Sequence, residues 1–384
     1  MRVLFAAGGT GGHLSPALSL ARTIRDEWDG ATAFLTAGRD VERHFLSPRD
    51  GGVTPLFPGS GSRPSLLRPR AWIDAVSRAR RAMESFQPHA VVAAGGYVTL
   101  PVVAAALAAN TPLYLLEQNA WPGRATRLAR PFARRIFCHF DGAAACLGQR
   151  AVACGSPLGV ALTGPLPARQ EARTRFGLDP DRPTLLVAGG SLGAQGVNDV
   201  VLDNARALAG WAQVLHITGD RRGDPERVRA HYRDAGLDAR VLPFCNEMVM
   251  AYRAADLIVC RAGGMTLAEI CTMGLPAVMV PYPAHRDRHQ YHNAEVLAQR
   301  GAGVVLEEQL ATAEAFRQVV VGLLRDETRL QAMGAAARSL ARPKAANRVL
   351  AILAEELGLA AAGRSERCHS KAEVPKTKGA DHVF

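Results

Sequence analysis

The sequence predicts an α/β fold of two domains, each built on a parallel β-sheet with helices on both faces. Short apolar runs alternate with helical patterns along the whole chain, as expected where strands are buried on both sides. The two halves also begin alike, each with an apolar run that leads into a glycine turn and then a helical pattern. At 384 residues the chain has the length of two domains or slightly more.

The predicted strands are the apolar runs that are rich in β-branched and aromatic residues. In the first half they cover residues 3–7, 31–36, 90–93, 112–116 and 135–138; in the second half they cover residues 184–188, 213–217, 240–242, 257–260, 277–280 and 303–306. The gaps between them carry helical patterns, for example at residues 15–28, 70–86, 197–209 and 312–325. Strands separated by helices form parallel sheets, so we expect two Rossmann-like domains.

Glycine and proline gather at residues 155–167, where we place a hinge. The predicted N-terminal domain covers residues 1–160 and the C-terminal domain residues 161–343. Residues 363–384 lack periodicity and are predicted to be disordered. Residues 87–116 carry no charge, but glycine and proline interrupt them, so we expect a strand, a loop, a helix and a second strand rather than a membrane span.

Composition excludes several classes of site. The four lysines lie at or beyond residue 344, so residues 1–343 hold neither a Walker-type phosphate loop nor a Schiff-base lysine. The seven cysteines form no CxxC pair, which argues against a zinc ribbon or a disulfide framework and favours a cytosolic chain. Of the net charge of +11, most lies in residues 1–160, where 18 arginines face 10 acidic residues. We therefore expect the first half to meet an anionic partner.

Three glycine turns follow predicted strands and precede helices, where backbone N–H groups can bind a phosphate. They occupy residues 8–12, 189–193 and 261–266. The dinucleotide pattern GxGxxG is not met, since the position of its third glycine is Leu14 in the first turn, and this disfavours a nicotinamide or flavin enzyme. Glu269 lies one turn into the helix that follows the third turn and could accept hydrogen bonds from sugar hydroxyls.

Six motifs occur in an order that resembles the MurG family of peptidoglycan glycosyltransferases. They are Gly8-Gly9-Thr10-Gly11-Gly12-His13, Gly95-Gly96-Tyr97, Glu117-Gln118-Asn119, Gly189-Gly190-Ser191-Leu192-Gly193-Ala194, residues 261–269 and His289-Gln290-Tyr291-His292-Asn293-Ala294. The resemblance covers roughly residues 1–350. It implies the GT-B fold, in which two Rossmann-like domains face each other across a cleft, and a final helix, here about residues 344–360, that packs back on the first domain.

The resemblance also implies an activity and its site. The expected reaction is an inverting transfer of N-acetylglucosamine from UDP-N-acetylglucosamine to the muramyl C4 hydroxyl of lipid I, which forms lipid II without a cofactor. His13 becomes the expected catalytic base, although it could instead orient the acceptor diphosphate. Donor and substrate binding is assigned to Thr10, Gly11, Gly12, Asn119, Arg169, Ser191, Cys245, Gly264, Met265, Thr266, Leu267, Ala268, Glu269 and Gln290, and the acceptor side to Gly95, Gly96 and Tyr97.

Two parts of the pattern depart from the family or need a separate test. The family's linker motif is only loosely matched, with Arg169 as the candidate arginine that contacts the nucleotide. His285, His289 and His292 would share one helical face and could bind zinc, but Arg286 and Arg288 would repel a cation and the motif gives Gln290 a sugar role. We therefore expect no metal.

Arginines and apolar side chains alternate before and within the helical pattern at residues 70–86, which is typical of a surface that docks on an anionic membrane. The predicted patch is Leu66, Leu67, Arg68, Arg70, Trp72 and Ile73. We expect a peripheral protein on the cytoplasmic face of the inner membrane, with other cell-wall synthesis proteins as further candidate partners. Nucleic acid is disfavoured because no base-reading element accompanies the charge.

The sequence is compatible with three alternatives. A non-hydrolysing UDP-N-acetylglucosamine 2-epimerase shares the fold, but it would leave the basic apolar patch unexplained. A different GT-B transferase could act on a glycolipid or natural product. A catalytically inactive nucleotide-sugar-binding subunit is disfavoured by the presence of His13, Glu269 and Gln290.

Overall fold

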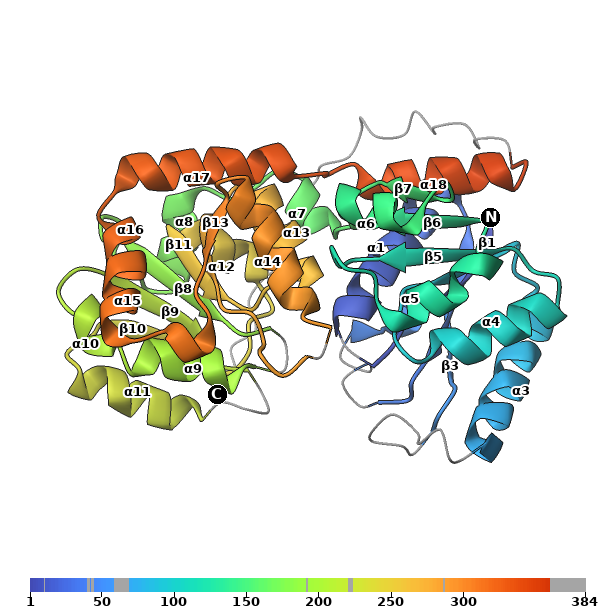
Figure 1. The fold of residues 1–384 in the computed structure, drawn as a ribbon, viewed down its shortest axis with the longest axis horizontal. Coiled ribbons are helices and arrows are strands. Elements are labelled where there is room, and N and C mark those ends of the chain that lie inside the picture. The colour runs from blue at the N-terminus through green and yellow to red at the C-terminus, as the bar shows by residue number, and fades with distance from the viewer. Residues whose placement is uncertain are drawn as a thin grey trace, which may run out of the picture.

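The computed structural model describes residues 1–359 except residues 10, 40, 41, 43, 44, 59–68, 191, 192, 220–223 and 286. It has two α/β domains side by side, each with a parallel sheet between helices (Figure 1). This confirms the predicted fold class. Within the described residues, no helix is both long and apolar enough to cross a membrane.

The N-terminal sheet has seven strands in the order β3-β2-β1-β4-β5-β6-β7. The strands are β1 (Arg2–Ala6), β2 (Ala31–Thr36), β3 (Gly52–Pro55), β4 (Ala90–Ala93), β5 (Leu113–Glu117), β6 (Arg135–Cys138) and β7 (Ala151–Ala153). The helices around it are α1 (Gly11–Trp28), η1 (Pro48–Asp50), α3 (Pro69–Phe86), α4 (Thr99–Ala108), α5 (Arg124–Ala129), η2 (Arg130–Phe132) and α6 (Asp141–Leu147).

The C-terminal sheet has six strands in the order β10-β9-β8-β11-β12-β13. They are β8 (Thr184–Ala188), β9 (Gln213–Ile217), β10 (Ala239–Leu242), β11 (Leu257–Cys260), β12 (Ala277–Met279) and β13 (Gly303–Val305). Helices α7 (Val160–Thr163), α8 (Arg169–Arg175), α9 (Gln195–Leu202), α10 (Ala205–Leu208), α11 (Pro225–Asp234), α12 (Met248–Ala254), α13 (Gly264–Met273) and α14 (His289–Gln299) connect them. After β13 come η3 (Glu308–Leu310), α15 (Ala313–Phe316), the π-helical segment η4 (Arg317–Val321), α16 (Gly322–Leu324), α17 (Glu327–Leu340) and α18 (Ala345–Glu356).

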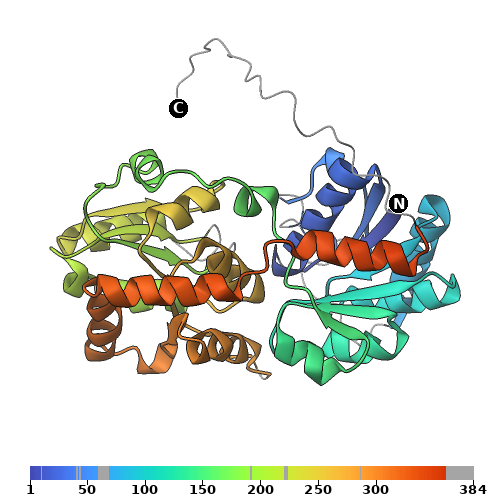
Figure 2. The ribbon, with the colours of Figure 1, turned by 90° about the horizontal axis from the view of Figure 1, so that it is seen from above.

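The chain passes between the two sheets twice (Figure 2). The first passage covers residues 154–183 and contains α7, so the domain boundary that we propose at residues 160 and 161 lies inside it. The second passage joins α17 to α18. The two passages touch, because a Cβ on Gly155 would lie 2.5 Å from the Cβ of Arg342, and Arg342 in turn pairs with Asp141 at 2.9 Å.

Helix α18 belongs to the core of the N-terminal domain although it ends the described chain. Its side chains Val349, Leu350 and Leu353 are buried in one cluster with Phe5 and Leu14. Arg135 at the start of β6 forms an ion pair with Glu356 at the last turn of α18. The C-terminal segment therefore ties the first domain to the second.

Both sheets reverse their strand order at a point that the sequence motifs mark. In the N-terminal sheet the reversal lies between β1 and β4, and in the C-terminal sheet between β8 and β11. In each pair the last paired residues, Ala6 with Ala93 and Ala188 with Cys260, come directly before the glycine-containing loops. Ligands of open parallel sheets bind outside the carboxyl ends of the strands at such reversals.

Candidate active site at the domain interface

The imidazole of His13 lies at the reversal point of the N-terminal sheet, in the first turn of α1. It packs on the glycine pair that follows β4: a Cβ on Gly95 would lie 3.2 Å from the ring and one on Gly96 3.3 Å from Nδ1. Both glycines have positive φ, +95° and +74°, which side chains rarely adopt. The Gly95-Gly96 motif therefore makes room for the His13 ring.

Burial lowers the pKa of the His13 imidazole below its ordinary value of 6.5. The charge of Glu117 and a hydrogen bond to the Gly8 backbone oppose this lowering, whereas His289 adds to it. Because the pKa is lowered, the ring is neutral at pH 7, the form in which an imidazole can act as a base. His289 belongs to the other domain, so His13 lies at the interface.

The first glycine turn is held by a buried carboxylate that sequence reasoning missed. Glu42 accepts hydrogen bonds from the backbone N–H of Gly9 at 2.7 Å and of Gly38 at 2.8 Å. Arg39 donates to the Gly9 carbonyl at 2.9 Å and lies over the ring of Tyr97. These contacts fix the backbone that precedes α1.

The amino end of α13 meets the loop after β5 directly across the interface. A Cβ on Gly264 would lie 2.1 Å from the Gln118 carbonyl oxygen, so only glycine permits this approach. Next to it, Asn293 of α14 is fully buried; its side chain accepts from the Ala120 N–H at 2.7 Å and donates to Asn119 Oδ1 at 3.1 Å and to the Ala262 carbonyl at 3.0 Å. Asn293 thus joins loops of both domains.

The loop that carries Asn119 is itself organised by Glu117 at the end of β5. Glu117 accepts from the backbone and the side chain of Asn119, both at 3.0 Å, and from the Gly123 N–H at 2.9 Å. The Asn119 amide is therefore engaged within the protein on both its oxygen and its nitrogen. In this structure Asn119 holds the interface together.

Glu269 lies half-buried on α13 and accepts a hydrogen bond from the Tyr252 hydroxyl at 2.6 Å. Burial raises the pKa of the Glu269 carboxyl above its ordinary value, and the hydrogen bond from Tyr252 opposes part of that rise. Of its neighbours on the helix, Leu267 packs in the main core and Met265 and Ala268 pack against Leu158. Any ligand contact of these three would come mainly through their backbone atoms.

Gln290 in the first turn of α14 accepts from the Tyr282 N–H at 2.9 Å. Cys245, which follows β10, is buried, and burial raises the pKa of its thiol, so the side chain is not a free ligand. Gly11 and Gly12 begin α1 beside His13, and Thr266 lies in the first turn of α13. Thr10 and Ser191 lie outside the described residues.

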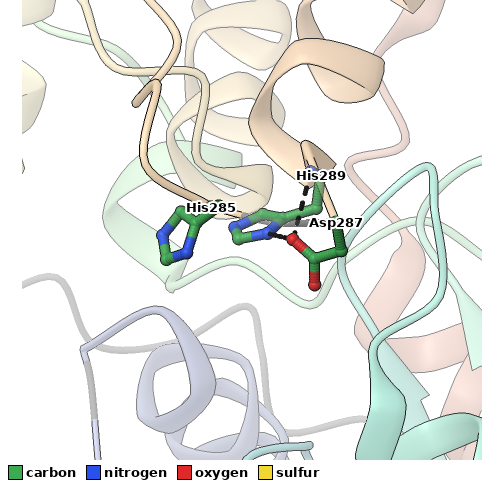
Figure 3. A group of neighbouring side chains, drawn as sticks. All are labelled: His285, Asp287 and His289. Atoms are coloured by element: carbon green, nitrogen blue, oxygen red, sulfur yellow. Dashed lines mark hydrogen bonds and ion pairs between the residues drawn. The ribbon is translucent and has the colours of Figure 1, made fainter.

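A group of side chains lies just before and at the start of α14, beside Gln290. His285, Asp287 and His289 bring their ligand atoms within 4.8 Å of one another (Figure 3). His292 is elsewhere, against Trp121 and 3.3 Å from Glu295. Since α14 begins only at His289, the helical spacing of His285, His289 and His292 assumed from the sequence was wrong.

Comparison with known proteins decides the family. The model of the glycosyltransferase family 28 N-terminal domain matches residues 3–138, and that of the C-terminal domain matches residues 184–349. A Syntrophotalea carbinolica protein named UDP-N-acetylglucosamine–N-acetylmuramyl-(pentapeptide) pyrophosphoryl-undecaprenol N-acetylglucosamine transferase is 37% identical, over 92% of this chain and 98% of its own. A Nocardioides protein of the same name is 38% identical, over 95% of this chain and 100% of its own.

The chain belongs to glycosyltransferase family 28. The crystal structure of Acinetobacter baumannii MurG superposes with a TM-score of 0.73 at 29% identity, covering 92% of this chain and 99% of that one. Together these matches confirm the MurG resemblance expected from the motifs. A Neisseria meningitidis UDP-GlcNAc 2-epimerase, at 13% identity and a TM-score of 0.66, shares the fold alone.

The structure does not bring Arg169 to this family 28 site. Arg169 forms an ion pair with Asp256, which also accepts from Arg173 at 2.6 Å and from the Thr184 N–H at 2.7 Å. Thr184 begins β8 and Asp256 precedes β11, so this cluster lies at the amino ends of the strands, opposite the glycine turns. The nucleotide contact implied for Arg169 does not fit this position.

We expect Arg169→Ala to leave the dissociation constant of UDP unchanged and to lower the free energy of unfolding by at most about 1 kcal/mol, because the pair is partly exposed. Asp256→Ala should cost about 3–5 kcal/mol, because it leaves the buried Arg173 charge without its partner. Denaturant unfolding and calorimetric titration with UDP measure both quantities. Weaker UDP binding by the folded Arg169→Ala variant would show that Arg169 does contact the nucleotide.

The predicted membrane patch is also changed by the structure. Leu66, Leu67 and Arg68 lie outside the described residues. Trp72 packs edge-on against Phe57 and so faces the core, whereas Arg70 and Ile73 are exposed. On α3 the apolar side chains face mainly inward and the arginines outward.

Proposed function

We propose that the chain transfers N-acetylglucosamine from UDP-N-acetylglucosamine to the C4 hydroxyl of the N-acetylmuramoyl-pentapeptide of lipid I, with inversion at the anomeric carbon, to give lipid II. Its relatives over nearly their full length are named as N-acetylglucosamine transferases acting on a pyrophosphoryl-undecaprenol acceptor. The observation that carries the proposal is the direct contact of Gly264 with Gln118. This contact brings the two reversal points, each with its glycine loops, to one interface.

The chemistry assigns one step to each side of the interface. His13 accepts the proton of the acceptor hydroxyl while its oxygen bonds to the anomeric carbon. The bond between that carbon and the diphosphate oxygen breaks, and UDP departs with the electron pair. The backbone N–H groups at the amino end of α13 and the helix dipole stabilise the charge on the departing diphosphate.

Glu269 is the proposed partner of the ribose hydroxyls, and its burial predicts opposite effects on binding and stability. The pKa of the Glu269 carboxyl is higher in the folded protein than in the unfolded chain. Its favourable contribution to the free energy of unfolding is therefore lost as the pH rises through the folded pKa. Glu269→Gln should therefore increase the free energy of unfolding at pH 7. It should weaken donor binding about 10- to 100-fold, because a charge-assisted hydrogen bond is replaced by a neutral one. Unchanged donor affinity in Glu269→Gln would mean that Glu269 does not bind the ribose hydroxyls.

The epimerase alternative has a simple test. The protein is incubated with UDP-N-acetylglucosamine alone and with a soluble lipid I analogue. Glycolipids are identified by mass, and nucleotide sugars by NMR, because the 2-epimer has the same mass as the donor. We expect UDP-N-acetylglucosamine to be consumed only when the analogue is present. Formation of the 2-epimer without an acceptor would overturn the proposal.

We also propose that the N-terminal domain docks on the anionic cytoplasmic face of the inner membrane, where lipid I is available, and that other cell-wall synthesis proteins join it there. Support comes from α5 and the following η2; α5 packs against α4, which in turn packs against α3 (Figure 1). Leu128 is 62% and Phe132 49% exposed, and no acidic residue occurs between positions 118 and 140. The exposed arginines around them are Arg124, Arg127, Arg130 and Arg134.

We expect Leu128→Asp to reduce sedimentation with vesicles containing anionic phospholipid at least about fivefold. The substitution removes an apolar side chain that would be buried in the docked membrane, and it adds a negative charge that anionic lipid repels. Leu310→Asp is the matched control, because Leu310 is 64% exposed but lies on η3 in the C-terminal domain. Equal binding by the two variants would place the docking surface elsewhere.

A further inference from the structure

We propose that His285, Asp287 and His289 form a binding site for a divalent transition-metal ion at the edge of the domain interface. The three residues come from the loop between β12 and α14 and from the first position of α14. Figure 3 shows the two imidazole rings side by side with the Asp287 carboxylate turned toward His289. Their ring centroids are 4.4 Å apart, and His289 Nδ1 lies 2.8 Å from Asp287 Oδ1.

The donor set suits such an ion. Two imidazoles and one carboxylate are ligands of Zn²⁺, Co²⁺ and related ions, and three protein ligands leave positions open for water or a substrate oxygen. With metal–ligand distances of about 2.0–2.2 Å in tetrahedral geometry, donor atoms around one ion lie about 3.4 Å apart. The present spread of up to 4.8 Å therefore needs side-chain movement of up to about 1.4 Å to close on an ion.

Among the described residues, the charge around the cluster is compatible with a cation. The arginine side chain nearest in sequence among the described residues, Arg288, is drawn away: its guanidinium carbon lies 4.1 Å from the Tyr291 ring centroid, and its Nη2 lies 3.9 Å from Glu307. The amino end of α14 opposes a cation, and the Asp287 carboxylate offsets it. Arg288 therefore does not direct its charge at the cluster.

The cluster lies beside residues of the candidate active site. His289 is followed by Gln290, and it is close enough to His13 to influence that ring electrostatically. Tyr282, which contacts the His285 ring, also donates to Gln290. An ion held by the cluster would therefore lie beside Gln290 and near His13, at the edge of the interface.

The test measures metal binding itself, so it is independent of the transfer reaction. Untagged, metal-free full-length protein is titrated with Co²⁺ and its visible absorption is followed. We expect one Co²⁺ per chain, with the absorption lost or the affinity reduced more than about tenfold in Asp287→Asn and in His285→Gln. His292→Gln is the control and should bind as the unchanged protein does.

His285 is exposed, so its replacement should not affect folding, and circular dichroism with thermal melting verifies this for each variant. Absence of one-to-one binding to the unchanged protein would overturn the proposal. So would equal affinity in His285→Gln, or an equal loss in His292→Gln.

Discussion

Replacing His13 by alanine is expected to lower kcat for transfer about 10²- to 10⁴-fold, the range typical of a lost general base. The dissociation constant of UDP-N-acetylglucosamine should stay within about twofold, because Glu269 and the amino end of α13, the main proposed donor contacts, lie on the C-terminal domain. His231→Ala is the control, since His231 lies exposed on α11 and contacts the Leu202 carbonyl at 2.9 Å. A His13→Ala variant that retains the full kcat would exclude the ring as base.

The role of His13 as the base also predicts how kcat/KM depends on pH. Protonated imidazole cannot accept the hydroxyl proton, so kcat/KM should fall as the pH decreases through the pKa of His13. Because burial lowers that pKa, the acid limb of the profile should lie below pH 6.5 in the free enzyme. The limb should be absent from the residual activity of His13→Ala.

Replacing Gly264 by alanine is expected to reduce kcat about 100-fold. The new Cβ would lie 2.1 Å from the Gln118 carbonyl oxygen and 2.8 Å from its carbon, so the two domains must move apart, and a displacement of about 1 Å at a reacting centre costs about that much. Both domains keep their own cores, so the melting temperature should change little.

Gly263→Ala provides a matched control one residue away. Its Cβ would meet nothing closer than Thr266 Oγ1 at 3.8 Å, and the Gly263 backbone has φ −71°, which alanine adopts freely. Steady-state kinetics of both variants should show near-normal turnover for Gly263→Ala alone. Equal activity in both would mean that the close approach of α13 to Gln118 is not needed for transfer.

Local pattern predicted the central strands well because burial on both faces requires an apolar run. Strands β8, β9 and β11 begin and end where the sequence placed them. Strands β3 and β7 were missed: β3 is an edge strand that is partly exposed and ends in Pro55, and β7 has only three residues. Neither offers the apolar run that marks a central strand.

The sequence predicted only those parts of the site that lie in or next to its glycine motifs. The loops at both strand-order reversals carried recognisable patterns, and these placed His13 and Gly264. Asn293 lay inside a quoted motif, but its role depends on a contact 173 residues away with Ala120, which no local pattern encodes. The Tyr252–Glu269 hydrogen bond joins two helices in the same way.

Two candidate residues lie where local pattern did not place them. Arg169 was the candidate for the family's loosely matched linker arginine, whereas strand direction places it at the opposite edge of the sheet from the glycine turns. Trp72 was taken as exposed because arginines surround it, but helical periodicity turns it toward Phe57. In both cases the three-dimensional direction of the element, rather than its composition, decided the outcome.

The most direct measurement is transfer of labelled N-acetylglucosamine from its UDP donor to a soluble lipid I analogue by the unchanged protein, His13→Ala and Glu269→Ala. We expect a β-linked disaccharide product from the unchanged protein, loss of product with retained donor binding in His13→Ala, and loss of both in Glu269→Ala. Tight binding of UDP-N-acetylglucosamine by the unchanged protein without any product would contradict the proposed acceptor, and absence of donor binding would contradict the proposed donor site.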